Sequence, residues 1–165
     1  MKKVFKIIIL LLNLLMTTII VLGFAFIFLF ILGIRPYVVQ SGSMEPIIET
    51  GSICFVNKNI KYENIKKNDI IAFKMNNSIL VTHRVISVTE NGLETKGDSN
   101  EISDGISTTK ENYIGKNIFS IPKVGYVIEL IQSKNGKIIF ITLIIILFLS
   151  SFLISKPNKG KHKKD

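Results

Sequence analysis

The chain of 165 residues has few of the side chains that bind metals or form covalent cross-links. It contains a single cysteine, Cys54, and two histidines. One cysteine excludes an intramolecular disulfide and a zinc site built from several thiolates, and a chain with two histidines is a poor metal binder. We therefore expect no metal site and no cofactor.

Charge is absent from two long stretches. Residues 7–34 form a run of 28 residues without an ionisable side chain. As a helix this run would span about 42 Å, more than the hydrocarbon core of about 30 Å. A basic start followed by an apolar run is also typical of a cleavable signal peptide. This run is about twice as long as usual for such a peptide, however, and lacks a small-x-small cleavage site before Arg35. We predict a transmembrane anchor over residues 7–34.

The second uncharged run covers residues 138–154 and has 17 residues. It would span about 25 Å, which suffices if Lys137 and Lys156 extend their ammonium groups to the two interfaces. We predict a second transmembrane helix over residues 137–155.

The formal net charge of +9 lies at the ends of the chain. Residues 35–136 carry 12 positive and 11 negative side chains, a balance of +1, whereas the remaining residues contribute +8. This distribution argues against nucleic-acid binding, which needs a basic surface on the folded domain. Basic residues gather on the cytoplasmic side of membrane helices. We therefore expect residues 1–6 and the tail 156–165 in the cytoplasm, with residues 35–136 outside the membrane.

The segment between the two runs is long enough for one small domain. Its short β-branched or apolar stretches alternate with turn-forming residues, and Asn76-Asn77 and Asn91-Gly92 favour tight hairpins. The pattern predicts a mainly β fold, a small folded β-sheet or barrel between two transmembrane α-helices. The expected strands cover residues 53–56, 69–74, 79–82, 84–89, 93–96 and 113–121.

Three places in this domain carry candidate chemistry. Ser41-Gly42-Ser43-Met44-Glu45-Pro46 is a small-residue turn that could present a serine hydroxyl on a constrained loop, although its composition also fits a linker next to the membrane. His83, at the junction of two expected strands, is the one imidazole outside the predicted cytoplasmic tail and thus the one candidate base for a serine nucleophile. Asp98 and Asp104 lie in the loop 95–105, and either could orient that histidine.

Together these segments resemble type I signal peptidases of the Ser/His branch, found in the endoplasmic reticulum, archaea and some spore-forming Gram-positive bacteria. Ser41–Pro46 resembles the nucleophile motif, which implies Ser43 as nucleophile and Ser41 with the Ser43 N–H as oxyanion donors. Asn68-Asp69-Ile70-Ile71-Ala72-Phe73 resembles the next motif, with Asn68 in place of glycine. Thr82-His83-Arg84-Val85-Ile86 carries histidine where the other bacterial branch has lysine.

The last motif of the resemblance is Lys96-Gly97-Asp98-Ser99-Asn100 followed by Asp104. It implies Asp104 as the acid of a Ser/His/Asp triad and Asp98 as a supporting acid. The resemblance implies a membrane-anchored serine endopeptidase that removes signal peptides from exported preproteins as they emerge from the translocon. Its expected partners are these preproteins and the lipid bilayer, and a small membrane partner stays open.

Two other functions fit the same pattern less well. An inactive membrane-tethered β-domain would bind a partner without cleaving it, but the chain retains all four polar residues of the expected site. An autoproteolytic regulatory serine protease on the same fold would not need a histidine base and two anchors.

Overall fold

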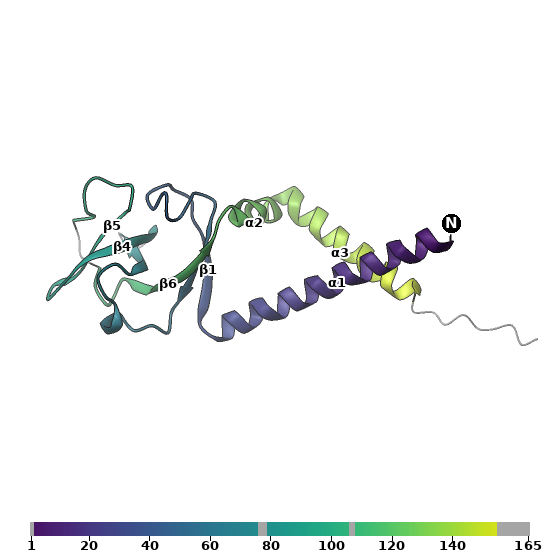
Figure 1. Cartoon of the computed structure of the whole chain (residues 1–165), viewed down its shortest axis with the longest axis horizontal. Coiled ribbons are helices and arrows are strands. Elements are labelled where there is room, and N and C mark those ends of the chain that lie inside the picture. The colour runs from purple at the N-terminus through teal and green to yellow at the C-terminus, as the bar shows by residue number, and fades with distance from the viewer. Residues whose placement is uncertain (1, 76–78, 106–107, 155–165) are drawn as a thin grey trace, which may run out of the picture. The chain divides into compact units, whose positions relative to one another are not determined.

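The computed structural model describes residues 2–75, 79–105 and 108–154. The chain divides into two compact units, one of residues 27–130 and the other of the remaining parts of the terminal segments. Figure 1 shows the β-strands gathered in the first unit. The expected hairpin at Asn76-Asn77 and the basic tail 156–165 lie outside the described residues.

The described elements follow a helix–sheet–helix order. Their bounds are α1 (Lys2–Ile31), β1 (Ile34–Val38), β2 (Ile53–Asn57), the 3₁₀ turn η1 (Tyr62–Asn64), β3 (Ile70–Met75), β4 (Ile79–Thr89), β5 (Gly92–Lys96), β6 (Tyr113–Ile121), α2 (Val124–Gln132) and α3 (Lys134–Ile154).

The six strands form one antiparallel sheet in the order β1-β2-β6-β3-β4-β5. The expectation of a mainly β domain is thereby confirmed, whereas closure of the sheet into a barrel is not. The long strand β6 reaches across to β2 and β3, which joins the two halves of the sheet. β1 was not expected from the sequence, because Pro36 lacks a backbone donor. A strand at the end of the strand order tolerates proline, and Pro36 pairs there with Phe55.

The predicted junction at His83 is wrong. The two stretches on either side of the histidine form a single strand, β4, of 11 residues. Side chains alternate between the two faces of a strand, so His83 shares the buried face with Val85. In the sequence, the polar histidine looks like a break between two apolar stretches. In the structure, the pairing of β4 with β3 continues through it.

The predicted first span extends three residues beyond the observed helix. α1 ends at Ile31, and a turn through Gly33 leads into β1, whose first residue Ile34 is buried in the core of the β-domain. Within the described residues, 10–31 form one helix long and apolar enough to cross a membrane.

The C-terminal helices differ in part from the expectation. Residues 134–154 are helical, as predicted, but α3 would qualify as a span only in combination with α2 as one bent segment. The second crossing therefore stays a prediction. α2 lies at the end of the expected β-domain, residues 35–136, after the last expected strand.

A core cluster beneath the site contains the single cysteine. Cys54 is fully buried with Met44, Ile48, Val56 and Ala72. Burial raises the pKa of its thiol from 9.0 to about 11, because the thiolate cannot be hydrated there.

This burial predicts a loss of stability in alkali. The folded state favours the neutral thiol. The contribution of this thiol to the free energy of unfolding is therefore complete below pH 9 and is lost as the pH rises to about 11. We expect the free energy of unfolding to fall by on the order of 2 kcal/mol from this thiol. Denaturant unfolding of the detergent-solubilised chain between pH 8 and pH 11 measures it. Cys54→Ala should be less stable than the parent at pH 8 but lose less on alkalinisation; parallel curves for the two proteins would contradict the assignment.

Candidate active site

Ser43 lies in a turn between β1 and β2, and the next residue, Met44, anchors this turn in the core. The turn is closed by the Glu45 N–H, which donates to the Gly42 carbonyl oxygen at 3.0 Å, and Met44 is 1% exposed in the core cluster. Burying Met44 points the preceding serine away from the core. The turn residues therefore present the Ser43 hydroxyl beside the sheet instead of on a solvated linker.

The Ser43 hydroxyl meets an imidazole from β4. Its Oγ lies 3.0 Å from His83 Nε2, across 40 residues of sequence. His83 is 6% exposed, and its ring packs edge-on against Phe73 of the adjacent strand β3. The strand and this aromatic contact hold the ring in one orientation.

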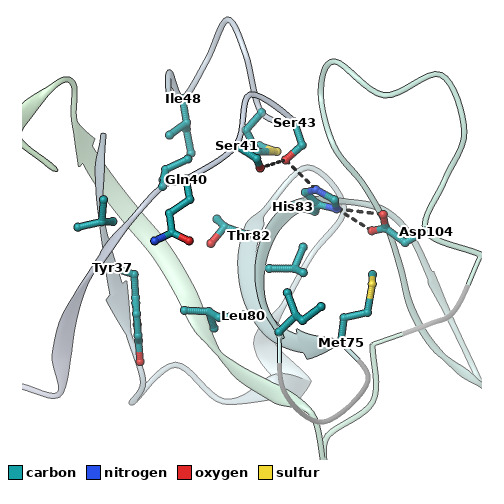
Figure 2. Close-up of a pocket in the computed structure, with 15 residues that line it drawn as sticks. Tyr37, Gln40, Ser41, Ser43, Ile48, Met75, Leu80, Thr82, His83 and Asp104 are labelled. Carbon is teal, nitrogen blue, oxygen red and sulfur yellow. Dashed lines mark hydrogen bonds and ion pairs between the residues drawn. The ribbon is translucent and has the colours of Figure 1, made fainter. Parts of the chain in front are cut away.

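The other ring nitrogen faces Asp104. His83 Nδ1 lies 2.8 Å and 3.0 Å from the two carboxylate oxygens of Asp104. The structure thus brings Ser43, His83 and Asp104 into one hydrogen-bonded chain, drawn in Figure 2. With Nδ1 protonated toward the carboxylate, Nε2 is the acceptor nitrogen that faces serine.

A further hydroxyl, which sequence reasoning missed, holds the carboxylate. Thr95 is fully buried in β5, and its Oγ1 donates to Asp104 Oδ2. The Asp104 N–H donates in turn to the Thr95 carbonyl oxygen at 3.0 Å. The alternation of buried residues along β5 could have marked Thr95 as an inward-facing polar side chain.

Asp98 contacts Arg84 and not the imidazole. Arg84 donates from Nε and Nη2 to its two carboxylate oxygens at 2.7 Å and 2.6 Å, and from Nη1 to the Asn68 carbonyl oxygen at 3.0 Å. The hydrogen bond to Asp98 raises the pKa of the guanidinium above its ordinary value. Asn68 adopts a positive φ of 76°, a backbone conformation that asparagine tolerates better than most other non-glycine residues.

The residues after Asp98 hold the serine turn. Ser99 donates from its backbone N–H to the Ser43 carbonyl oxygen at 3.0 Å, and from its hydroxyl to the Gly42 carbonyl oxygen at 2.8 Å. A Cβ at Gly97 would lie 2.6 Å from that Ser43 oxygen, so only glycine permits this approach. The Arg84–Asp98 pair therefore supports the Ser43 turn from the side and does not touch the imidazole.

Ser41 lies next to the nucleophile candidate. Its Oγ is 3.4 Å from the Ser43 Oγ, at the outer limit of a hydrogen bond. Both residues line the same cavity, and Figure 2 shows their hydroxyls next to each other.

The cavity beside the hydrogen-bonded residues Ser43, His83 and Asp104 has a volume of about 770 Å³. One wall is the extended segment from Tyr37 to Ser41, the other is the first half of β4, and Ser43, His83 and Asp104 lie at one end. Apart from Ser41 and His83, the wall residues were not identified from the sequence, because they come from segments some forty residues apart. No group of three or more His, Cys, Asp or Glu side chains suited to a metal occurs among the described residues.

Comparison with known proteins places the chain in a family. Residues 11–118 match the family model described as signal peptidase, peptidase S26. The chain belongs to the peptidase S26 family of signal peptidases.

Named relatives of this S26 chain come from bacteria and eukaryotes. Signal peptidase I W of Bacillus subtilis is 37% identical over 78 residues, which cover 45% of this chain and 41% of that protein. The human signal peptidase complex catalytic subunit SEC11C is 40% identical over 86 residues, or 48% of this chain and 44% of that protein. SEC11 of Komagataella phaffii is 34% identical over 120 residues, or 61% of this chain and 69% of that protein. The match to the first two spans less than half of their length.

The Arg84–Asp98 contact of this S26 chain yields a prediction about stability. Asp98→Asn removes the charge and one acceptor from a partly buried bidentate pair, and we expect it to lower the free energy of unfolding by about 1–2 kcal/mol. Denaturant unfolding in detergent measures the change.

Glu63→Gln is the matched control for Asp98→Asn. It breaks the pair of Glu63 with Lys110, whose side chains are 54% and 75% exposed, and we expect no measurable change because water screens such a pair. Equal effects of the two substitutions would show that the Asp98 pair does not support the fold.

Proposed function

We propose that this chain is a membrane-anchored serine endopeptidase that removes amino-terminal signal peptides from exported preproteins by a Ser43/His83/Asp104 mechanism. The observation that carries the proposal is the hydrogen-bonded sequence from the Ser43 hydroxyl through both nitrogens of His83 to Asp104. Membership of the signal peptidase family supports the same reaction.

Ser43 is the nucleophile and His83 the general base in this mechanism. As Oγ attacks the scissile carbonyl carbon, its proton passes to Nε2 across the 3.0 Å contact. The tetrahedral intermediate collapses, the C–N bond breaks, and the imidazolium donates its proton to the leaving amine. His83 then removes a proton from water, which attacks the acyl ester and releases the new carboxylate together with Ser43.

Asp104 orients the imidazole and stabilises its charged form. Its carboxylate accepts from Nδ1, which selects the neutral tautomer whose Nε2 faces Ser43 as an acceptor. Thr95 satisfies one carboxylate oxygen and limits its rotation. The oxyanion is held by the Ser43 N–H and the Ser41 hydroxyl, which lies close enough to Ser43 Oγ to reach the same reacting carbonyl.

The preprotein lies extended in the cavity between the Tyr37–Ser41 segment and β4. Two extended segments on opposite walls offer backbone groups to an added strand, and apart from His83 and Asp104 at one end the lining side chains carry no charge. Met75, Leu80 and Val81 favour small apolar side chains over charged ones near the cut.

The membrane positions enzyme and substrate together. Ser43 follows the last helical residue of α1, Ile31, by 12 residues, so the reaction takes place near the outer surface. A signal peptide has its apolar segment in the bilayer and its cleavage site just beyond it. Both termini of the chain face the cytoplasm in this arrangement, and α3 provides the second crossing.

Substitution of the two serines tests the proposal. Ser43→Ala should abolish cleavage of a labelled preprotein while the chain stays folded and membrane-inserted, since one partly exposed oxygen is removed. Ser41→Ala should lower the rate by up to about 10² to 10³, the effect of losing one oxyanion donor. Cleavage by the purified protein in detergent, with the new amino terminus identified, is the measurement. Full activity of Ser43→Ala would end the proposal, and an essential Ser41 beside a dispensable Ser43 would exchange their roles.

Substitution of the base and the two acids tests the mechanism. His83→Lys should lose most activity, because the carboxylate of Asp104 favours the charged ammonium, which cannot accept a proton. Asp104→Asn should slow cleavage by more than about 100-fold through loss of tautomer control. Asp98→Asn should slow it less, since this acid contacts Arg84 and not His83. Cleavage of a reporter preprotein is measured with the three variants present at equal amounts in the membrane. A larger defect in Asp98→Asn than in Asp104→Asn contradicts the assignment.

A further inference from the structure

Helix α2 presents an apolar face that the β-domain does not cover. Val124, Val127 and Leu130 recur at intervals of three residues, and their exposed fractions are 38%, 54% and 68%. On a helix this spacing places the three side chains along one side. An exposed apolar stripe of this kind needs an apolar medium or partner.

The opposite face fixes how the helix is rotated. Gly125 is buried, and a Cβ there would lie 2.6 Å from the Gly51 carbonyl oxygen, which accepts a hydrogen bond from the Gly125 N–H at 2.8 Å. The Tyr126 hydroxyl donates to the Thr50 carbonyl oxygen at 3.2 Å. The contacts of Gly125 and Tyr126 allow little rotation of α2 about its axis, so the apolar stripe is held outward.

The lipid bilayer is the medium that the neighbouring contacts indicate. Ile128 of α2 and Leu29, in the last turn of α1, pack on the same buried cluster of Ile34, Ile53 and Phe55. Both helices thus meet the β-domain at one place. Around Leu29 the side chains of Ile27, Phe28 and Ile31 are 58%, 60% and 74% exposed, as expected for a segment that lies in lipid.

Arg35 marks the level at which this lipid ends. Its guanidinium lies 3.2 Å from the centre of the Phe30 ring and donates to the Phe30 carbonyl oxygen at 2.6 Å, at the end of α1. A cation that turns back to the last turn of a membrane helix is typical of the headgroup region. Since α2 shares its supporting cluster with this turn, it lies at the same level.

We propose that α2 is an interfacial helix, with Val124, Val127 and Leu130 inserted among the lipid headgroups and upper acyl chains on the side of the membrane where the β-domain lies. The proposal rests on insertion of α1 and does not depend on catalysis.

A consequence for the active site follows from the Thr50 contact. The N–H and hydroxyl of Thr50 donate to Glu45 in the serine turn at 3.2 Å and 2.9 Å, while its carbonyl oxygen accepts from Tyr126. α2 is thus joined by two hydrogen-bonding steps to the turn that carries Ser43. An interfacial α2 sets the height of that serine above the lipid.

A single introduced tryptophan tests the proposal, because the chain contains none. Val127→Trp is placed in the full-length protein and reconstituted into phosphatidylcholine vesicles that carry bromine either near the headgroup or near the acyl-chain end. Interfacial insertion predicts at least about twofold quenching by the headgroup-proximal bromines and weaker quenching by the deep ones. Val124→Trp, on the same side of α2, repeats the measurement should the first variant misfold.

Val88→Trp in β4 is the matched control. Val88 is 54% exposed, the same fraction as Val127, but it lies on the β4–β5 side of the strand order, away from β1. Neither brominated lipid should quench it. Val127→Trp fluorescence that resists both lipids but is quenched by aqueous iodide would overturn the proposal, and so would stronger quenching by the deep bromines, which would make α2 part of a span.

Discussion

The site depends on how the turn that carries Ser43 is held against the sheet, since this turn lies outside the strand ladders. Met44 secures it from within the core, and Ser99 secures it from the side through the carbonyl oxygens of Gly42 and Ser43. The side contact requires that Gly97 have no side chain. A displacement of either support would move the Ser43 hydroxyl relative to His83, and proton transfer across 3.0 Å tolerates little displacement.

The alternation of side chains along β4 separates the two aspartates of one loop. His83 faces inward and takes Asp104, whereas the next residue, Arg84, faces the other way and takes Asp98. The buried imidazole receives the acid that would stabilise its charged form, and the more exposed guanidinium receives the acid that shapes the loop. Adjacent positions on one strand thus direct one carboxylate to the imidazole and the other to the guanidinium.

The end of α1 and the middle of α2 meet the β-domain at one cluster. Ile34, Ile53 and Phe55 support both Leu29 and Ile128. The turn from Thr50 to Ser52 lies between this cluster and the Ser43 turn, and it contacts both α2 and Glu45. In this chain the end of α1, helix α2 and the Ser43 turn are therefore related through short-range contacts instead of a flexible tether.

Local patterns in the sequence were enough to predict the apolar first helix, the mainly β domain and the candidates Ser43, His83, Asp98 and Asp104. Hydrophobic runs, β-branched stretches and family motifs consist of residues that are neighbours in the sequence, so they can be recognised without the fold. The sequence could not decide between the two aspartates from spacing, and it missed β1, α2 and the role of Thr95. Those features depend on pairing across the sheet: Pro36 is tolerated by its position in the strand order, and β4 continues through a histidine that the core accepts. Only the tertiary structure places Asp104 beside His83, since residues 21 positions apart meet when β4 and β5 pair and bring the loop after β5 over the imidazole.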